Sequence, residues 1–181
     1  MASIPEIDNH IIRQCQTRDA DAFRSLVMAY TNYVYALAYR ILWNEQDAED
    51  VVQETFFRVW KSIKRFEVDR KFSTWLYTIV TNLCRDNLRK RKRKNENEVP
   101  RDCQRPAREV NDDLSNLTLD IVKQLAAGLP DTQRIVFVLR DLQDIPIRDV
   151  ALILSTTENA VKSNLYYARK ALREKYKQIN S

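Results

Sequence analysis

Apolar residues recur at intervals of three and four positions over most of the chain, which is the spacing of helices with one buried face. The clearest stripe belongs to a helix predicted over residues 73–94, and its first members are Phe72, Trp75, Leu76, Ile79, Val80 and Leu83. The same spacing predicts further helices over residues 9–15, 20–43, 46–63, 117–127, 130–142, 147–154 and 157–179. The hydrophobic pattern therefore predicts an all-α protein.

Residues that favour helix ends mark several of these boundaries. Ser73 or Thr74 is expected to cap the helix that follows it. Pro130 and Pro146 suit the opening of two helices in the second half, and Gly128 suits the end of another.

Only Ser155 and Thr156 separate the last two predicted helices. Two helices joined by so short a turn form a candidate helix-turn-helix, whose second helix can enter the major groove of DNA. The alternative is an ordinary surface helix with scattered charges. The positions expected to meet base edges are Asn159, Lys162, Ser163 and Tyr166.

The helical period is lost over residues 95–115, which contain Pro100, Pro106 and many charged residues. This stretch is too long for a loop inside a compact domain, so we expect a flexible linker there. The sequence thus predicts two small helical domains, over residues 9–94 and 116–181.

The composition excludes several classes of protein. The chain has one Gly, one His and three Cys, so it cannot build a glycine-rich phosphate cradle or a multi-histidine zinc site. The widely spaced Cys15, Cys84 and Cys103 suit reduced thiols rather than a disulfide or zinc framework. We therefore expect no cofactor and no metal. Because no signal peptide or apolar membrane span is evident, we expect a cytoplasmic protein.

The net charge of +5 is unevenly distributed. Residues 61–94 carry most of the positive charge, and the segment before them is acidic. The basic end of this stretch consists of Arg85, Arg89, Lys90, Arg91, Lys92, Arg93 and Lys94. Such a run suits phosphate binding, although a solvated helix end would look the same. The polar ridge before it favours nucleic acid, because hydroxyl, amide and guanidinium groups follow helical spacing at Thr74, Thr78, Thr81, Asn82, Arg85 and Arg89.

Aromatic residues are dense just before this ridge, at Phe56, Phe57, Trp60, Phe66, Phe72, Trp75 and Tyr77. They could stack on unpaired bases or pack in the core, and core packing is favoured for Phe72 and Trp75. The short loop formed by residues 66–71 is a better candidate for recognition, since it joins two helices beside the basic ridge.

Acidic residues cluster at the start of the helix predicted over residues 46–63. The favourable dipole interaction at a helix N-terminus explains Asp47, Glu49 and Asp50. It does not require Gln53 and Glu54, which extend the cluster along the helix. The cluster, with the later Trp60, is therefore a candidate protein-binding face.

Three ordered segments together resemble a bacterial extracytoplasmic-function (ECF) sigma factor, the two-domain group-four type of the sigma-70 family. DAEDVVQETFFRVW (47–60) is similar to the polymerase-binding segment of that family. RFEVDRKFSTWLYTIVTNLCRDNLRKRKRK (65–94) resembles the segment that melts the promoter and recognises the −10 element. Residues 129–176 resemble the domain that recognises the −35 element.

The resemblance implies a role for each matching position. The residues implied to dock on the clamp helices of RNA polymerase are Asp50, Gln53, Glu54 and Trp60. The residues implied to bind the −10 element, together with the basic ridge, are Phe66, Glu67, Val68, Asp69, Arg70, Lys71, Asn82, Arg85 and Arg89. The residues implied to recognise the −35 element, with the helix positions above, are Asn159, Lys162, Ser163, Tyr166 and Tyr167.

The resemblance also implies the partners. They are core RNA polymerase, through its clamp helices and flap, promoter DNA as duplex and as melted non-template strand, and an anti-sigma factor, often membrane-bound in this family. No small-molecule substrate and no enzymatic activity are expected. The alternatives are a stand-alone helix-turn-helix regulator and a small nuclease. The single His and the lack of metal ligands disfavour the nuclease.

The sequence departs from the family pattern in the last predicted helix. Asn164 and Tyr167 stand where two arginines are customary, and the loss of two phosphate contacts should weaken −35 binding. The loop over residues 67–71 also lacks a customary glycine. We therefore expect the first domain to dominate promoter binding, with the basic run over residues 89–94 offsetting a weaker second domain.

Overall fold

The computed structural model describes residues 7–97, 122–126 and 128–179. Within these ranges the secondary structure is helical and contains no strand, which confirms the all-α prediction. The helices of the first half are α1 (Asn9–Gln16), α2 (Ala20–Leu42), α3 (Glu45–Ser62), the single turn η1 (Ile63–Arg65) and α4 (Phe72–Asn97). Residues 122–126 are helical, and the second half continues with α6 (Asp131–Phe137), η2 (Val138–Leu142), α7 (Ile147–Ile153) and α8 (Glu158–Ile179).

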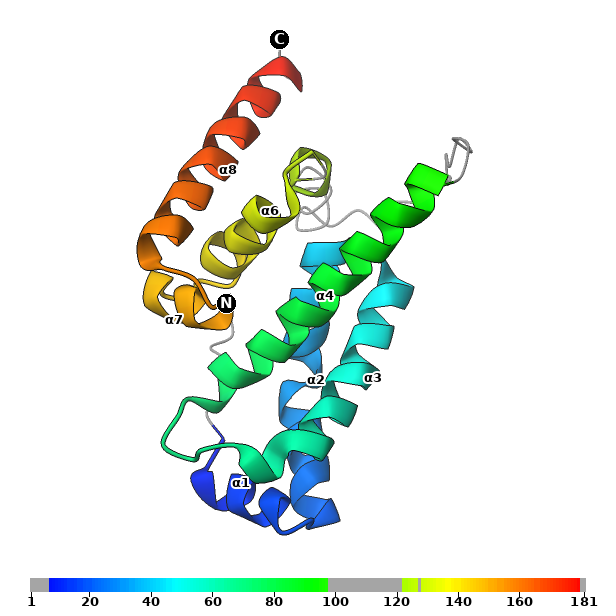
Figure 1. The fold of residues 1–181 in the computed structure, drawn as a ribbon, viewed down its shortest axis with the longest axis vertical. Coiled ribbons are helices and arrows are strands. Elements are labelled where there is room, and N and C mark those ends of the chain that lie inside the picture. Colours follow the sequence, from blue (N-terminus) through cyan, green and yellow to red (C-terminus); the bar gives the residue numbers. More distant parts are fainter. Residues whose placement is uncertain (1–6, 98–121, 127, 180–181) are drawn as a thin grey trace, which may run out of the picture.

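Helices α1 to α4 form one bundle, in which α2 packs against both α3 and α4 (Figure 1). Asp19 caps α2, because its Oδ1 accepts hydrogen bonds from the amides of Asp21 and Ala22 at 2.9 and 3.0 Å. Trp43 then adopts a left-handed conformation with φ of 51° and ends α2. Asn44 caps α3 by accepting a hydrogen bond from the amide of Asp47 at 2.9 Å. The short connection makes α2 and α3 antiparallel neighbours.

The predicted apolar stripes form the buried core of this bundle. The residues buried along α2 include Leu26, Tyr30, Val34, Leu37 and Ile41. They meet Val51 and Val59 of α3 and Leu76 and Val80 of α4 within one core cluster. Cys84 is also buried there, and burial raises the pKa of its thiol to about 12. Cys15 and Cys84 are both free thiols in this core, whereas Cys103 lies outside the described residues.

Helices α6 to α8 form the second group. The single helix predicted over residues 130–142 changes at Val138 into η2, a turn of π-helix. Helices α7 and α8 form the predicted helix-turn-helix, with Ser155 in the turn at a φ of 50°. Thr157 supports the start of α8, because its Oγ1 accepts a hydrogen bond from the amide of Ala160 at 3.2 Å. In Figure 1, α8 lies on the side of this group away from α2 and α3.

The predicted helix ends are partly wrong. Helix α4 begins at Phe72, so Ser73 and Thr74 lie inside its first turn instead of capping it. Pro130 and Pro146 do lie at the opening of two helices, in the positions just before α6 and α7. Residue 127, just before Gly128, lies outside the described residues, so the role of Gly128 at a helix end stays a prediction. Most of the predicted linker, residues 98–115, lies outside the described residues.

The two helical groups touch each other where α4 begins (Figure 1). Lys71 Nζ, just before α4, lies 3.1 Å from Asp149 Oδ2 of α7. Arg40 of α2 donates a hydrogen bond to the carbonyl of Leu142 at 3.0 Å. Buried Ile145 and Ile153 belong to the same core cluster as the first group. None of the described helices combines the length and hydropathy that a membrane crossing requires.

Arg91 turns inward from the basic run and fastens the far part of α4. Its NH1 donates a hydrogen bond to the carbonyl of Leu42 at 3.0 Å, and its NH2 pairs with Asp47 at the start of α3. Burial, followed by the positive charge of Arg134, lowers the pKa of Arg91. The expectation that the whole run over residues 89–94 faces DNA is therefore wrong at Arg91, because its guanidinium binds the α2–α3 junction.

Arg91→Ala should destabilise the protein, whereas Lys92→Ala should not. Loss of Arg91 leaves a carboxylate and a helix-end carbonyl without their cation, at a cost of about 1 kcal/mol for a partly exposed site. Lys92 is exposed, and its removal should change the free energy of unfolding by less than about 0.5 kcal/mol. Urea unfolding followed by helical circular dichroism measures both values. Equal stabilities for the two variants would contradict the structural role of Arg91.

Candidate nucleic-acid and protein interfaces

The outer side of α3 brings together three of the four residues predicted to bind polymerase. Ala48, Val51, Thr55 and Val59 bury the inner side of the helix, so the opposite side faces solvent. Asp50 and Gln53 are exposed there and Glu54 is partly exposed. Glu54 also pairs with Arg58, with 2.7 Å between Oε1 and Nε.

Trp60 follows Gln53 by seven residues and so lies near it on α3, but it is only partly exposed. Its ring packs edge-on against Phe23 of α2, with the centroids 4.7 Å apart. The guanidinium of Arg18 lies 4.6 Å from the centroid of the Trp60 ring and also donates a hydrogen bond to its carbonyl. These contacts fix α3 to the α1–α2 turn, which is a structural role for Trp60.

Phe57, which was not among the predicted site residues, lies on the exposed face instead. The residue is 52% exposed, and Lys61 Nζ lies 4.0 Å from its ring centroid. The signal for this position was present in the sequence, since Phe57 follows Glu54 by three residues and Gln53 by four. The aromatic cluster around Phe57 suits base stacking as well as core packing, so composition does not single this residue out.

The predicted recognition loop, residues 66–71, is held firmly at its first residue. Phe66 is 6% exposed and packs against Phe72 and Trp75, with ring centroids 5.5 and 5.0 Å away. Gln16 of α1 donates a hydrogen bond to the Phe66 carbonyl at 2.7 Å. The Phe66 ring is therefore part of the core rather than a surface for stacking. Val68 is also partly buried against the core.

The remaining loop residues carry the exposed charge. Glu67, Asp69, Arg70 and Lys71 are exposed. Arg70 Nε lies 2.6 Å from Glu67 Oε2. Lys71 reaches across to Asp149 as described above. The loop thus presents two cations, each paired with a carboxylate.

The polar ridge of α4 is narrower than predicted. Thr81 is fully buried, and its hydroxyl donates a hydrogen bond to the carbonyl of Tyr77 at 2.8 Å. The prediction that Thr81 belongs to the exposed ridge is therefore wrong, because its side chain faces the inside of the bundle. Asn82 and Arg89 are exposed and Arg85 is partly exposed. Arg85 NH1 donates a hydrogen bond to Asn82 Oδ1 at 3.3 Å, so the two side chains lie together.

The first turns of α8 expose the residues predicted to recognise the −35 element, which are Asn159, Lys162, Ser163, Tyr166 and Tyr167. Val161, Leu165 and Ala168 are buried on the opposite side. The rings of Tyr166 and Tyr167 lie edge to face, with centroids 5.4 Å apart. This exposed face is polar and aromatic, and carries one cation at Lys162.

Two side chains near this face bond within the domain. Asn164 donates a hydrogen bond to the carbonyl of Ala160 at 2.8 Å, so its amide lies along its own helix. Arg169 forms two hydrogen bonds with Asp141 of η2, at 2.8 and 2.7 Å. These hydrogen bonds raise the pKa of Arg169. The pair fixes α8 against η2 and neutralises one of the cations beside the exposed face.

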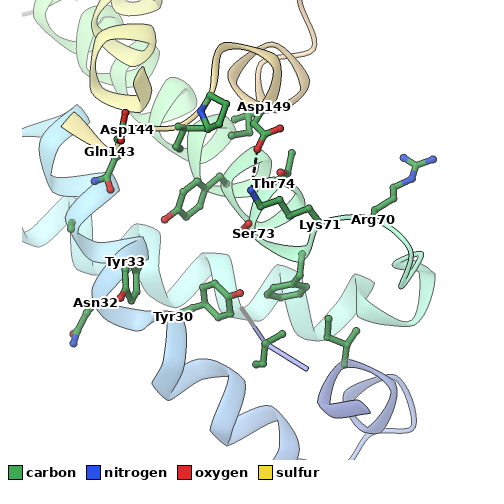
Figure 2. Close-up of a pocket in the computed structure, with 18 of the residues that line it drawn as sticks. Tyr30, Asn32, Tyr33, Arg70, Lys71, Ser73, Thr74, Gln143, Asp144 and Asp149 are labelled. Atoms are coloured by element: carbon green, nitrogen blue, oxygen red, sulfur yellow. Dashed lines mark hydrogen bonds and ion pairs between the residues drawn. The ribbon is translucent and has the colours of Figure 1, made fainter. Parts of the chain in front are cut away.

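A cleft of about 1050 Å³ separates the two helical groups beside the Lys71–Asp149 ion pair (Figure 2). Tyr30, Asn32 and Tyr33 line it from α2, and Gln143 and Asp144 line it from the other group. Tyr77 also lines the cleft, and burial raises the pKa of its hydroxyl. Both polar and apolar side chains line the cleft, which lies against the base of the recognition loop. Among the described residues, no cluster of carboxylate, imidazole or thiolate groups is arranged to hold a metal ion.

Comparison with protein families assigns these surfaces to two known regions. Sigma-70 region 2 matches residues 26–94, which contain the α3 face, the loop and the α4 ridge. Sigma-70 region 4 matches residues 119–172, which contain the helix-turn-helix. The ECF RNA polymerase sigma factor SigW of Bacillus subtilis is 33% identical over 188 residues, covering 93% of this chain and 96% of that protein.

Two solved structures share the fold over most of the chain. The structure of CnrH in complex with the cytosolic domain of CnrY has a TM-score of 0.73 at 26% identity and covers 94% of this chain and 97% of that one. The sigma factor RpoE of Bartonella quintana, in complex with the anti-sigma factor NepR, has a TM-score of 0.68 at 25% identity and covers 87% and 98%. With both regions matched in order and a relative aligned over nearly its full length, the chain belongs to the extracytoplasmic-function sigma factors of the sigma-70 family.

Proposed function

We propose that this protein is a dissociable initiation subunit that binds core RNA polymerase, directs it to specific promoters and helps to melt the −10 element. One observation carries the proposal. A single chain presents an acidic face on α3, an amide and guanidinium ridge on α4 and a helix-turn-helix at α8, and both sigma regions match these elements. The catalytic chemistry belongs to the polymerase, so the protein itself is not an enzyme. Its site of action is then the chromosome in the cytoplasm.

We propose that Asn82, Arg85 and Arg89 contact the −10 element together with the exposed loop residues Arg70 and Lys71. An unpaired base is stabilised by a polar edge and a nearby cation, and Asn82 and Arg85 supply both at 3.3 Å from each other. Phe66 supports this surface from below, because it fixes the loop on the core.

We propose that the exposed first turns of α8 recognise the −35 element as duplex DNA. A recognition helix contacts base edges through the residues near its N-terminus. Asn159, Ser163 and Tyr166 can donate or accept hydrogen bonds there, and Lys162 can contact a phosphate. The positions of the two customary arginines contribute little charge, because Asn164 bonds to its own helix and Tyr167 is neutral.

We propose that the contact between the two helical groups is an inactive arrangement that an anti-sigma factor maintains. The CnrH and RpoE structures were both determined with a bound partner protein, named an anti-sigma factor for RpoE. In this chain Lys71 of the recognition loop pairs with Asp149, so one DNA-binding cation is occupied by a carboxylate of the other group. Opening the cleft frees Lys71 for a phosphate.

Run-off transcription tests the proposed function directly. Core RNA polymerase is mixed with a pool of randomised promoters, with and without the protein. We expect transcripts that depend on the protein and that come from a defined subset of the pool, whose enriched bases give both elements. Absence of such transcripts, together with tight duplex binding by the protein alone, would instead support a stand-alone helix-turn-helix regulator.

Asp149→Asn should strengthen binding to a single-stranded −10 oligonucleotide. The change removes the carboxylate that pairs with Lys71, and an exposed ion pair contributes up to about 1 kcal/mol, so a two- to fivefold gain in affinity is expected. Asp144→Asn is the matched control, because Asp144 lines the same cleft but pairs with Arg140. Fluorescence anisotropy measures both. An unchanged affinity for the Asp149 variant would contradict the blocking role of the ion pair.

Tyr167→Arg should strengthen binding to duplex −35 DNA and increase its salt dependence. One new phosphate contact makes the negative slope of log K against log salt steeper by about 0.9. Tyr176→Arg is the control, since Tyr176 is 53% exposed on the same helix, close to the 54% of Tyr167, but lies far from its first turns. Titrations at several salt concentrations give both slopes. Equal slopes for the two variants would show an unspecific effect of charge and contradict the assignment.

A further inference from the structure

Phe57 is a large apolar side chain that the fold leaves in solvent. It is 52% exposed, whereas the adjacent Phe56 is 7% exposed and belongs to the core. Single exposed apolar residues are common on protein surfaces. The meaning of Phe57 therefore depends on where it lies on α3 and on what surrounds it.

Helical geometry places Phe57 at the centre of the outer face of α3. Each residue turns the helix by about 100°, so positions three, four and seven apart lie on one side. Phe57 follows Glu54, Gln53 and Asp50 by these intervals. The ring is thus in line with all three polar residues and opposite the buried side of the helix.

The charges around Phe57 are arranged as a polar rim. Asp50 and Glu54 precede it along the helix, and Arg58 and Lys61 follow it. Lys61 lies over the ring by a cation–π contact but still leaves half of the residue exposed. An aromatic anchor inside a polar rim is the arrangement that carries most of the binding energy in protein interfaces.

Trp60 is unsuited to the role of an aromatic anchor. Its ring is already in contact with Phe23 and Arg18, so a partner could use it only by breaking packing that holds α3 to α2. Phe57 offers apolar area to a partner without any such loss.

We propose that Phe57 is the apolar anchor through which α3 binds core RNA polymerase, with Asp50, Gln53 and Glu54 as the rim. The inference rests on the proposed function and transfers to Phe57 the aromatic contact that the family resemblance assigned to Trp60. The complementary surface on the polymerase combines an apolar depression for the ring with basic side chains opposite Asp50 and Glu54.

Competition for core RNA polymerase tests this assignment with the full chain. Labelled wild-type protein is displaced from the polymerase by unlabelled variants. Phe57→Ala should bind about 10- to 30-fold more weakly, the loss typical of an interface anchor, and Phe57→Leu should recover most of the affinity. The thermal unfolding midpoint and the affinity of Phe57→Ala for duplex −35 DNA should equal those of the wild type, because the ring lies outside the core.

Two control variants separate the anchor from exposed apolar area and from structure. Met28→Ala removes a side chain that is 73% exposed on α2 and should leave polymerase binding unchanged. Trp60→Ala should lower the unfolding midpoint. The anchor assignment is overturned if Phe57→Ala binds as tightly as the wild type, or if Met28→Ala weakens binding equally. Failure of the wild-type protein itself to bind polymerase would overturn the proposed function instead.

Discussion

The mutual packing of α2, α3 and α4 determines the direction of nearly every candidate binding residue in the first half of the protein. The side chains of Leu26, Val34 and Leu37 are completely buried along α2, so its neighbours cannot rotate without opening the core. A helix with one side fixed has its opposite side fixed as well. The acidic face of α3 and the amide ridge of α4 are consequently preorganised, and binding does not have to order them.

The contact between the two helical groups is of another kind. It combines apolar packing around Ile145 and Ile153 with two polar contacts, Lys71 with Asp149 and Arg40 with the Leu142 carbonyl. An exposed ion pair contributes only up to about 1 kcal/mol, and the cleft beside it leaves part of the contact unpacked. Interfaces between domains of one chain that are of this composition allow relative motion. A rigid bundle joined to its partner group by such a contact is compatible with the proposed opening of the cleft.

The sequence was sufficient for the helices and their buried sides, because both follow from spacing along the chain. It was insufficient where a side chain's partner is distant in sequence. The basic run predicts that Arg91 faces DNA, but its guanidinium binds the Leu42 carbonyl and Asp47. Phe66 looked like a loop residue available for stacking, but Gln16 of α1 and the ring of Phe72 hold it inward. The prediction that Thr81 is exposed is wrong for a local reason. A threonine hydroxyl that donates a hydrogen bond to the preceding helical turn needs no other partner, so the side chain can be buried.

The same distinction explains why aromatic residues were harder to assign than charged ones. A charged side chain on a helix is nearly always at the surface, so Asp50 and Lys162 were placed correctly by type alone. An aromatic side chain is stable on the buried or the exposed side of a helix. Only its angular position on the folded helix decides whether it faces the core or solvent. Phe56 and Phe57 are adjacent in sequence and differ by about 100° on α3, which puts the first in the core and the second in solvent. The fold thereby uses one pair of identical residues for two purposes: Phe56 stabilises the bundle, and Phe57 remains available to a partner.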